Sequence, residues 1–266
     1  MPKTYVNGIN IYYEDHGKGE PLVLVQGFGG GHQGWFFQVP DFKKRFRVIT
    51  FDNRGMGKTD RSLAPYTVRT MADDVIGLMD YLGIDQAHIL GLSLGGMVAQ
   101  EIAITYPGRV KKLVLGSTFS SHAVRDTGPE SGKDTGVHNK PAGKDYSNMK
   151  LDALMVPVVA AAFNRTHYRM IFTLMLKLGT RPVAINNYLE QINAMRDYST
   201  ADRLHLIKAQ TLVITGTGDR LVQPGNSDLL AAAIPGAKLV KVEGGSHAFF
   251  IEMSSRFNYE VLKFLS

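Results

Sequence analysis

The chain has 266 residues, of which 44% are hydrophobic and 20% charged, and it carries a formal net charge of +6. This length and composition are typical of a globular protein with a large hydrophobic core, and no apolar run approaches the roughly 18 residues needed to cross a membrane. The absence of cysteine excludes disulfides, thiol nucleophiles and cysteine–zinc sites. Residues 1–7 contain no apolar segment typical of a secretory signal, so we expect a cytoplasmic protein.

Basic residues gather in two short clusters, at 43–47 and at 109–112. A positive net charge can indicate a nucleic-acid partner or an anionic substrate. Each cluster precedes or enters an apolar strand-like run, however, and no nucleic-acid-binding motif accompanies either one. We therefore expect solvated surface charge, with no nucleic-acid and no membrane partner. The oligomeric state stays open.

Short β-rich runs alternate with helical patterns along the chain, which predicts an α/β fold with a mostly parallel sheet flanked by helices. Buried parallel strands are continuous apolar runs, as at 22–25 and 113–115. Amphipathic helices are expected at 68–82, at 94–106, after Pro224 and at the C-terminus. The expected strands are 9–13, 22–25, 47–51, 87–90, 110–115, 211–215 and 238–242.

The alternation is interrupted between residues 120 and 205. A polar stretch at 121–147, rich in Gly, Pro, Ser and charge, predicts a mobile loop, and apolar helical patterns follow it. We therefore expect a core formed by residues 1–119 and 206–266, with residues 120–205 inserted between two of its strands.

The segment Gly91-Leu92-Ser93-Leu94-Gly95 matches the pattern G-x-S-x-G. Alone the match is weak, because a glycine-rich loop with a helix-capping serine would also fit. The segment follows the expected strand 87–90 and opens a helix, which is the context that a nucleophilic serine requires. The strained turn of such a serine leaves no room for neighbouring side chains. Ser93 is therefore the predicted nucleophile.

A serine hydroxyl becomes nucleophilic only beside a base that takes its proton. Of the 8 histidines, His247 follows the expected strand 238–242, on the edge of the sheet where α/β proteins bind ligands. Asp219 follows the strand 211–215 on the same edge and would orient the imidazole. An aspartate after glycines is otherwise an ordinary turn residue. The other seven histidines lack such a setting, and His88 is expected to pack within a strand.

The order Ser93, Asp219, His247 along the chain is that of the α/β-hydrolase superfamily, which the sequence clearly resembles over nearly its whole length. The stretch 51–60, FDNRGMGKTD, is similar to the family's D-x-R-G-x-G-x-S loop, with threonine in place of the serine. Within the superfamily the chain looks most like the carboxylesterase and enol-lactonase branch. The resemblance implies an α/β-hydrolase fold in which residues 120–205 form a helical cap over the active site.

The resemblance also implies an oxyanion hole made of two backbone N–H groups. One belongs to Leu94, which follows the nucleophile. The other lies in the family's H-G-x-G segment, which here is Gln26-Gly27-Phe28-Gly29, so Phe28 is the matching donor. Gln26 replaces the family's histidine. Because the donors are main-chain groups the hole should persist, but the hydrogen bonds inside the loop must differ.

Two glycine-rich motifs point to other ligands. Residues 29–34 fit the dinucleotide pattern G-x-G-x-x-G, with Asp52 at the distance of a ribose-binding acid, but Pro40 would stop the required helix within about two turns. Residues 57–59 imitate the end of a phosphate-binding loop, whose first glycine would fall at Asp52. We expect no cofactor and no metal. Asp52 is instead expected to shape its own loop, and Asp73 and Asp74 to lie on the polar face of a helix.

These features predict a serine hydrolase that cleaves carboxylic esters with small to medium acyl groups, with lactones and thioesters as further candidates. The insertion holds 11 Lys/Arg against 8 Asp/Glu, which would tolerate an anionic substrate. Flexible apolar side chains of the insertion suit an acyl pocket, although each could simply pack cap against core. The candidate pocket residues are Gln26, Met149, Met155, Phe163, Met170, Phe172 and Met175.

Three alternatives stay open. A cofactor-free haloperoxidase or perhydrolase would use the same triad with peroxide as acceptor. A carbon–carbon bond hydrolase of the same fold would cleave dienone acids and leave simple esters intact. A ligand receptor with a vestigial triad would bind tightly without turnover.

Overall fold

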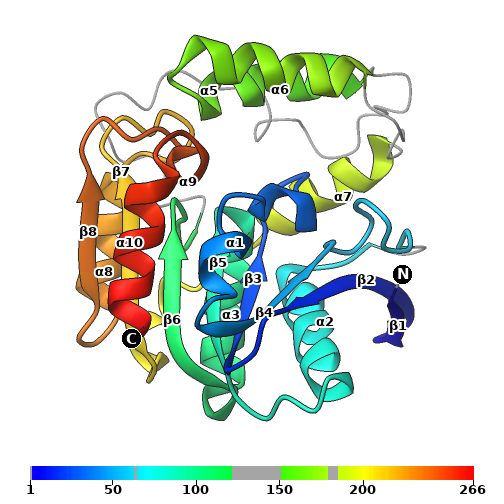
Figure 1. Ribbon diagram of the computed structural model, residues 1–266, viewed down its shortest axis with the longest axis vertical. Helices are drawn as coiled ribbons and strands as arrows, with labels where there is room; N and C mark the ends of the chain where they lie inside the picture. The colour runs from blue at the N-terminus through cyan, green and yellow to red at the C-terminus, as the bar shows by residue number, and fades with distance from the viewer. Residues whose placement is uncertain (1, 63–64, 122–150, 179–184) are drawn as a thin grey trace.

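The computed structural model describes residues 2–62, 65–121, 151–178 and 185–266 (Figure 1). Within these residues the centre is an eight-stranded sheet in the order β1-β2-β4-β3-β5-β6-β7-β8. β2 runs antiparallel to β1 and β4, and every other pairing is parallel. The strands are β1 (Lys3–Val6), β2 (Ile9–His16), β3 (Glu20–Val25), β4 (Phe46–Phe51), β5 (Ala87–Leu92), β6 (Val110–Gly116), β7 (Gln210–Gly216) and β8 (Lys238–Val242).

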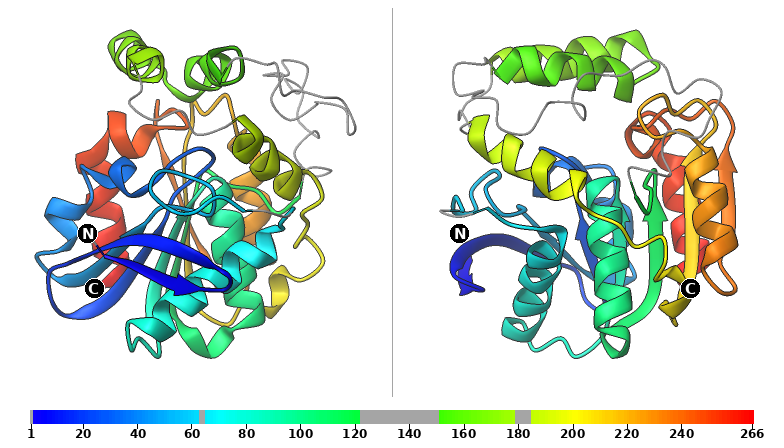
Figure 2. Two further views of the ribbon diagram at one scale, coloured as in Figure 1. Left: turned by 90° about the vertical axis from the view of Figure 1, so that its right-hand side faces the viewer. Right: turned by 180° about the vertical axis from the view of Figure 1, so that it is seen from behind.

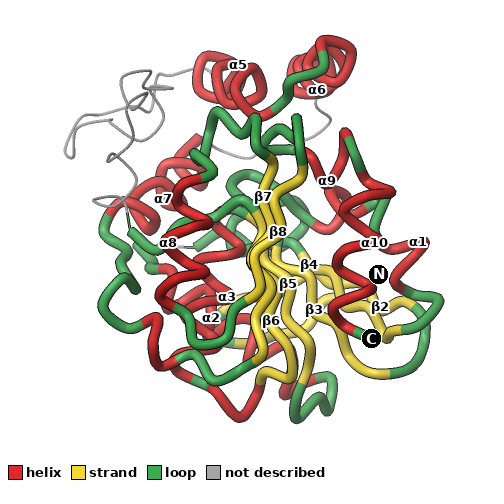
Figure 3. Tube along the Cα trace, turned by 90° about the vertical axis from the view of Figure 1, so that its left-hand side faces the viewer, coloured by secondary structure: helices red, strands yellow, loops and turns green. Residues whose placement is uncertain are grey.

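Helices cover both faces of the sheet, as the edge-on view shows: α2, α3 and α8 lie on one side, and α1 and α10 on the other (Figure 3). The predicted α/β fold is confirmed. The helices are α1 (Val39–Phe42), α2 (Val68–Tyr81), α3 (Leu94–Thr105), α5 (Leu151–Ala162), α6 (Thr166–Leu178), α7 (Ile185–Arg196), α8 (Gly225–Ala233), α9 (Phe249–Glu252) and α10 (Ser254–Leu265), with short 3₁₀ helices at His32–Trp35, Pro107–Arg109 and Leu204–Leu206.

The central strands are buried on both faces, which explains their continuous apolar sequence. Successive side chains of a strand point to opposite faces. Val23 and Val25 of β3 therefore join the core that includes α2 and α3. Leu22 and Leu24 join the core on the other face, which contains Phe257 of α10.

All seven predicted strands are present, and β1 is a further strand at the edge of the sheet. It forms a hairpin with β2 through Asn7 and Gly8, whose φ angles are 46° and 81°. An Asn-Gly pair with two positive φ angles is the preferred two-residue hairpin turn. The sequence therefore contained the information that identifies β1.

α5, α6 and α7 come between β6 and β7 in the chain, within the predicted insertion. In all views α5 and α6 lie across the end of the molecule toward which the parallel strands point (Figures 1 and 2). The polar stretch 121–147 lies outside the described residues, apart from Ser121. Among the helices that the structure describes, none is both long enough and apolar enough to cross a membrane.

Asp74 of α2 is buried, with 2% of its surface exposed, so its expected position on a polar helix face is wrong. Its two carboxylate oxygens accept hydrogen bonds from Nε and Nη2 of Arg54, at 2.9 and 2.5 Å. Arg54 belongs to the glycine-containing loop after β4. The buried, bidentate ion pair therefore fixes that loop onto α2.

Basic residues of both clusters are paired with carboxylates rather than free in solvent. Arg47 contacts Asp15 across the β2–β4 pair at 2.8 Å, and Lys111 contacts Glu20 at 2.7 Å. These partly exposed pairs neutralise part of the positive charge that the sequence places in the clusters.

Candidate active site

Ser93 occupies a strained turn between β5 and α3. Its φ and ψ angles are 54° and −119°, a backbone conformation that L-residues rarely adopt. A side chain at Gly91 would overlap the backbone of Gly95, and one at Gly95 would overlap the carbonyl of Val25. Strain of this kind persists only where the surrounding structure enforces it, and it is common at functional sites. The glycines of the G-x-S-x-G segment are therefore a steric requirement of this turn.

Hydrogen bonds with the end of β6 and the residues that follow it hold the turn in place. The N–H of Ser93 donates to the carbonyl of Gly116 at 2.9 Å, and the Thr118 hydroxyl donates to the carbonyl of Ser93 at 2.7 Å. On the other side, a Cβ added to Gly27 would lie 3.1 Å from Cβ of Ser93. The loop after β3 and the predicted nucleophile are thus in close contact.

His247 and Asp219 form a hydrogen-bonded pair on the loops after β8 and β7. Nδ1 of His247 lies 2.9 Å from Oδ2 of Asp219, and the carboxylate is fully buried. Its other oxygen accepts the backbone N–H groups of Leu221 and Val222, at 2.9 and 2.8 Å. Because these backbone groups can only donate, the carboxylate of Asp219 acts as an acceptor here. A hydrogen on Nδ1 of His247 then completes the pair, and Nε2 is the ring nitrogen that stays available as the predicted base.

Among the described residues, no hydrogen bond joins the hydroxyl of Ser93 to the imidazole of His247. Hydrogen bonds of this kind are often long in the free enzyme and tighten only when substrate binds. The structure therefore contains the His247–Asp219 pair of the predicted triad and places Ser93, after β5, on the same edge of the sheet.

Gln26 organises the loop that carries the predicted oxyanion donor. Its Oε1 accepts the N–H of Gly27 at 2.9 Å, and its side chain occupies space that a Cβ at Gly30 or Gly34 would fill. The N–H of Gly30 donates to the carbonyl of Gly27 at 3.1 Å. In a trans peptide the carbonyl and the N–H point in opposite directions, so this bond turns the N–H of Phe28 away from the loop interior.

The N–H groups of Phe28 and Leu94 make no hydrogen bond within the part of the chain that the structure describes. Backbone N–H groups that lie away from water are nearly always paired, so two free ones beside a strained serine are an arrangement suited to binding an oxyanion. Asn53 supports the same loop by donating to the carbonyl of Gln26 at 2.9 Å.

The candidate pocket residues of the insertion lie in different places. Met155 is buried, and its Cε would lie 3.3 Å from a Cβ at Gly29, so it contacts the loop that carries the predicted oxyanion donor. Phe163 is buried and stacks on Phe172, with ring centroids 4.6 Å apart. Met170 is 67% exposed on the surface of α6. Met149 and the side chain of Met175 lie outside the described residues.

Phe163 also belongs to a small apolar cluster with Ala248, the residue after His247. The end of α5 is joined to the same loops by the backbone, since Ala248 donates to the carbonyl of Ala162 at 2.9 Å. Asn164 donates to the carbonyl of Gly218 at 3.2 Å, next to Asp219. The insertion is therefore attached directly to the loops that carry the histidine and the aspartate.

Two polar residues of α7 attach the insertion to the other side of the site, and the sequence did not single them out. Gln191 accepts the N–H of Gly29 at 2.8 Å, and Asn187 donates to the carbonyl of Gly55 at 2.9 Å. Both side chains are buried. Their spacing of four residues on the face that also buries Ile192 is the pattern that could have identified them.

The glycine motifs that suggested other ligands have structural roles. Asp52 accepts the backbone N–H groups of His32 and Lys58, both at 2.8 Å, so it shapes its loop as predicted. Pro40 lies in the first turn of α1, which is only four residues long. Across the described residues, His, Asp and Glu side chains form no group of three that could hold a metal ion.

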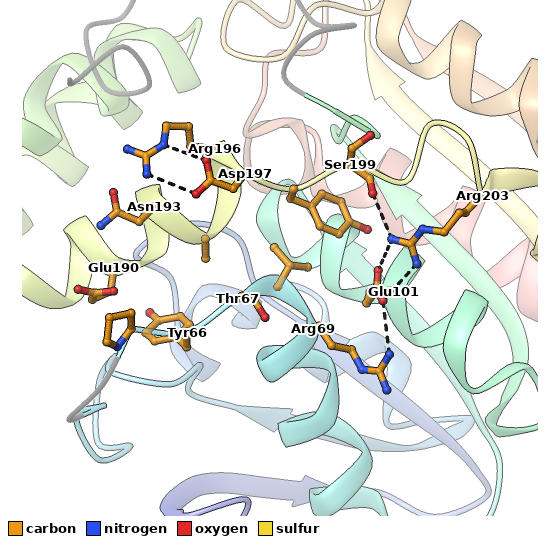
Figure 4. A pocket seen from close by; sticks show the side chains of 14 residues that line it. Tyr66, Thr67, Arg69, Glu101, Glu190, Asn193, Arg196, Asp197, Ser199 and Arg203 are labelled. Carbon is orange, nitrogen blue, oxygen red and sulfur yellow. Dashed lines mark hydrogen bonds and ion pairs between the residues drawn. The ribbon is translucent and has the colours of Figure 1, made fainter. Parts of the chain in front are cut away.

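A cavity of about 570 Å³ lies away from these residues, between the end of α7 and the start of α2 (Figure 4). Most of its charged side chains bind one another: the buried carboxylate of Glu101 contacts Arg203 at 3.0 Å and Arg69 at 3.8 Å. Neither Ser93 nor His247 lines it. We therefore place the candidate active site at the Ser93 turn rather than in this cavity.

Comparison with known protein families identifies the family to which the chain belongs. The family model described as "alpha/beta hydrolase fold" matches residues 20–253. The chain belongs to the α/β-hydrolase family. Among its relatives are two proteins named "Putative carbamate hydrolase RutD". The one from Azorhizobium caulinodans is 28% identical over 99% of this chain and 98% of its own, and the one from Caulobacter segnis is 32% identical over 96% of both.

Solved α/β-hydrolase structures of different activities are similar over nearly the whole chain. The enol-lactonase of Burkholderia xenovorans LB400 has a TM-score of 0.84 and 26% identity, and covers 99% of both chains. The meta-cleavage product hydrolase of Pseudomonas fluorescens IP01 has a TM-score of 0.81 and 27% identity, covering 100% of this chain and 97% of its own. The bromoperoxidase of Bacillus anthracis has a TM-score of 0.82 and 26% identity, covering 97% and 95%.

Proposed function

We propose that this α/β hydrolase is a serine hydrolase that cleaves carboxylic esters through an acyl-enzyme. Ser93 is the nucleophile, His247 the general base and Asp219 the residue that orients the imidazole. The observation that carries the proposal is the buried His247–Asp219 pair, at 2.9 Å, on the sheet edge that also presents the strained Ser93 turn. In this arrangement a serine hydroxyl can be deprotonated as it attacks.

The reaction proceeds in two halves. The Ser93 oxygen bonds to the ester carbonyl carbon while Nε2 of His247 takes the hydroxyl proton, and the N–H groups of Phe28 and Leu94 hold the oxyanion. The carbon–oxygen bond of the ester then breaks, and the alcohol leaves with the proton from His247. A water molecule attacks the acyl-enzyme with His247 again as base, which releases the carboxylic acid and restores Ser93.

α5, α6 and α7 serve as the cap of this site. The contact of Met155 with Gly29, and the attachment of α5 beside Ala248, support a pocket whose walls come partly from the insertion. Apolar walls with few polar groups suit a small or medium acyl chain. We therefore expect p-nitrophenyl esters of short acids to be cleaved faster than those of long acids. Lactones and thioesters present the same acyl carbon to Ser93.

Carbamate hydrolysis is the second candidate. It is favoured by the RutD relatives, which match this chain over 96–99% of its length. A carbamate carbonyl would meet the same nucleophile and oxyanion donors as an ester carbonyl. The two functions therefore differ only in the substrate, and the same residues carry both.

A substrate panel tests the proposal. Esters, lactones, thioesters and carbamates are incubated with the wild type and with Ser93→Ala, and initial rates are compared. The value of kcat for the variant should fall by roughly 10⁴-fold or more, as it does when the triad serine of a serine protease is removed. Ser255→Ala, the same change at an exposed serine of α10, serves as the control. Substantial ester cleavage by Ser93→Ala would overturn the assignment of the nucleophile.

The alternatives give different results in the same assay series. Peroxide-dependent halide oxidation would indicate a haloperoxidase or perhydrolase. Cleavage of a dienone acid without turnover of simple esters would indicate a carbon–carbon bond hydrolase. Tight ligand binding with no turnover, and no labelling of Ser93 by a fluorophosphonate, would indicate a receptor.

A further inference from the structure

Gln191 of α7 carries a buried hydrogen-bond donor that the fold does not use. The side chain has 0% of its surface exposed. Its Oε1 accepts the N–H of Gly29 at 2.8 Å, whereas its Nε2 has no hydrogen-bond partner among the residues that the structure describes. Buried polar atoms are almost always paired in folded proteins, so each exception requires an explanation.

The orientation of this amide is fixed by its neighbour. The N–H of Gly29 can only donate, so the carbonyl oxygen of Gln191 must face it and the NH₂ group must point elsewhere. A flipped side chain would place two donors against each other. The hydrogen bond from Gly29 therefore determines which end of the amide is oxygen and which is nitrogen, and the unpaired end is the NH₂ donor.

Nε2 lies beside the loop that we propose as the oxyanion hole. Gly29, which bonds the other end of the amide, directly follows the proposed donor Phe28. Apolar groups surround Gly29: the rings of Phe28 and Tyr188 meet edge to face with centroids 5.7 Å apart, and both Tyr188 and Met155 contact Gly29. A single free donor within apolar walls is how ligand pockets usually recognise a polar atom of an otherwise apolar ligand.

The other face of α7 is polar. Glu190 and Asn193 line the separate polar cavity (Figure 4). Asn187, one turn before Gln191, uses its side-chain N–H to bind the carbonyl of Gly55. Of the two buried amides of α7, the one next to the oxyanion loop is thus the one whose N–H₂ group is left unpaired.

We propose that Nε2 of Gln191 donates a hydrogen bond to a second oxygen on the acyl group of the substrate. This inference rests on the proposed function and narrows it: the preferred substrates are esters whose acyl chain carries an ether, keto or carboxylate oxygen close to the scissile carbonyl. Simple fatty-acyl esters leave the donor unpaired and are poorer substrates.

Two matched pairs of p-nitrophenyl esters test the proposal. Methoxyacetate and butyrate differ by one oxygen in place of a methylene, and 4-oxopentanoate and pentanoate differ by one keto oxygen. Gln191→Glu keeps an oxygen to accept the N–H of Gly29 and removes the donor. At alkaline pH, where the introduced carboxyl is ionised, kcat/KM for the oxygenated members should fall roughly tenfold, the equivalent of one lost hydrogen bond. The plain members should change much less.

Comparing each variant with the wild type on the same ester removes intrinsic differences in ester reactivity. A neutral carboxyl can still donate, so the gap between the oxygenated and the plain members should grow as the pH rises, whereas a structural defect would lower both members alike. Asn187→Leu, which removes the neighbouring amide of α7, is the matched control and should affect both members of each pair equally. Equal effects of Gln191→Glu on both members, at every pH, would overturn the inference.

The role of Gln191 and the proposed function can fail independently, and the experiments distinguish the two failures. If Ser93→Ala still cleaves the esters, the nucleophile is wrong; if only the discrimination between paired esters is missing, the role of Gln191 alone is wrong. Should Gln191→Glu fail to fold, a crystal structure of Ser93→Ala with p-nitrophenyl methoxyacetate decides the question. The ether oxygen of the methoxyacetyl group within hydrogen-bond distance of Nε2 supports the inference, and any other placement of that oxygen refutes it.

Discussion

The hydroxyl of Ser246 donates a 2.5 Å hydrogen bond to the buried carboxylate of Glu252. The same carboxylate accepts the backbone N–H groups of Asn164 and Arg165, at 3.3 and 2.7 Å. Glu252 therefore joins the residue before His247 to the turn between α5 and α6. One side chain links the position of the proposed base to the position of the insertion.

Glu252→Gln should lower kcat. Glutamine keeps the shape but presents an NH₂ group to one of the three donors, which pushes the histidine loop or the α5–α6 turn away. A displacement of about 1 Å can cost roughly a hundredfold in rate, so we expect a loss between about tenfold and a hundredfold. Steady-state kinetics on a short-chain ester measures it. Glu260→Gln is the matched control, because Glu260 is also buried but pairs with Arg256 on α10. Equal kcat in the two variants would exclude the positioning role.

Asp219→Asn should reduce kcat far more. The carboxylate accepts two backbone N–H groups and the imidazole, and an amide cannot accept from all three. The imidazole would then favour the wrong tautomer, and in a serine protease triad the same change costs about 10⁴-fold in kcat. Asp228→Asn, at an exposed aspartate paired with Lys241, controls for the loss of charge. An Asp219→Asn enzyme with near-normal turnover would show that another group orients His247.

The sequence predicted the fold correctly, and it nominated Ser93, Asp219 and His247 for the proposed triad, because both inferences depend on local patterns. The spacing of apolar residues predicts the strands and helices. The two glycines of the five-residue segment around Ser93 predict a strained turn. Asp219 and His247 could be chosen because parallel strands end on one edge of the sheet. The parallel arrangement of β5, β7 and β8 therefore places the three loops that follow them on one edge of the sheet.

The supporting residues were not predicted because their partners are distant in the sequence. Gln191 and Gly29 are separated by 162 residues, and Glu252 and Arg165 by 87. Asp74 was assigned to a polar helix face because its charge is visible in the sequence, whereas its pairing with Arg54 of another loop is not. Roles that depend on a tertiary contact of this kind require coordinates.

Gln26→Ala tests the replacement of the family's histidine in the oxyanion loop. The change removes the acceptor for the N–H of Gly27 and empties the space between Gly30 and Gly34. The loop that orients the N–H of Phe28 should loosen. Removal of one oxyanion donor costs about a hundredfold to a thousandfold in kcat, and misplacing it should approach the lower value.

The exposed Gln33 of the same segment provides the control variant, Gln33→Ala. Both proteins are assayed for kcat and KM on one ester, and their melting temperatures are compared. The prediction requires that Gln26→Ala loses kcat with little change in KM, since the oxyanion forms only during the reaction. A loss confined to KM would place Gln26 in substrate binding instead.

His88 should make the protein less stable in mild acid. Burial lowers the pKa of its imidazole, and the charges of Lys111 and Lys112 act in the same direction, against the partial opposition of Glu20. The folded chain therefore resists protonation at a pH where the unfolded chain, with a histidine pKa of about 6.5, accepts the proton. The free energy of unfolding should fall as the pH drops below about 6.5. Hydrogen bonds to Lys111 and His88 hold the pKa of Glu20 at about 2, so the contribution of Glu20 is lost only at lower pH.

His88→Phe removes this titration and keeps the edge-to-face packing on Phe46, whose ring centroid lies 5.6 Å away. Urea unfolding at a series of pH values should then give a shallower decline of the unfolding free energy below about 6.5 than in the wild type. His205→Phe, at an exposed histidine of the Leu204–Leu206 turn, should leave the slope unchanged. If the curves of unfolding free energy against pH for the wild type and His88→Phe stay parallel through this range, His88 is protonated equally in the folded and unfolded states. The acid sensitivity would then have to arise from other groups.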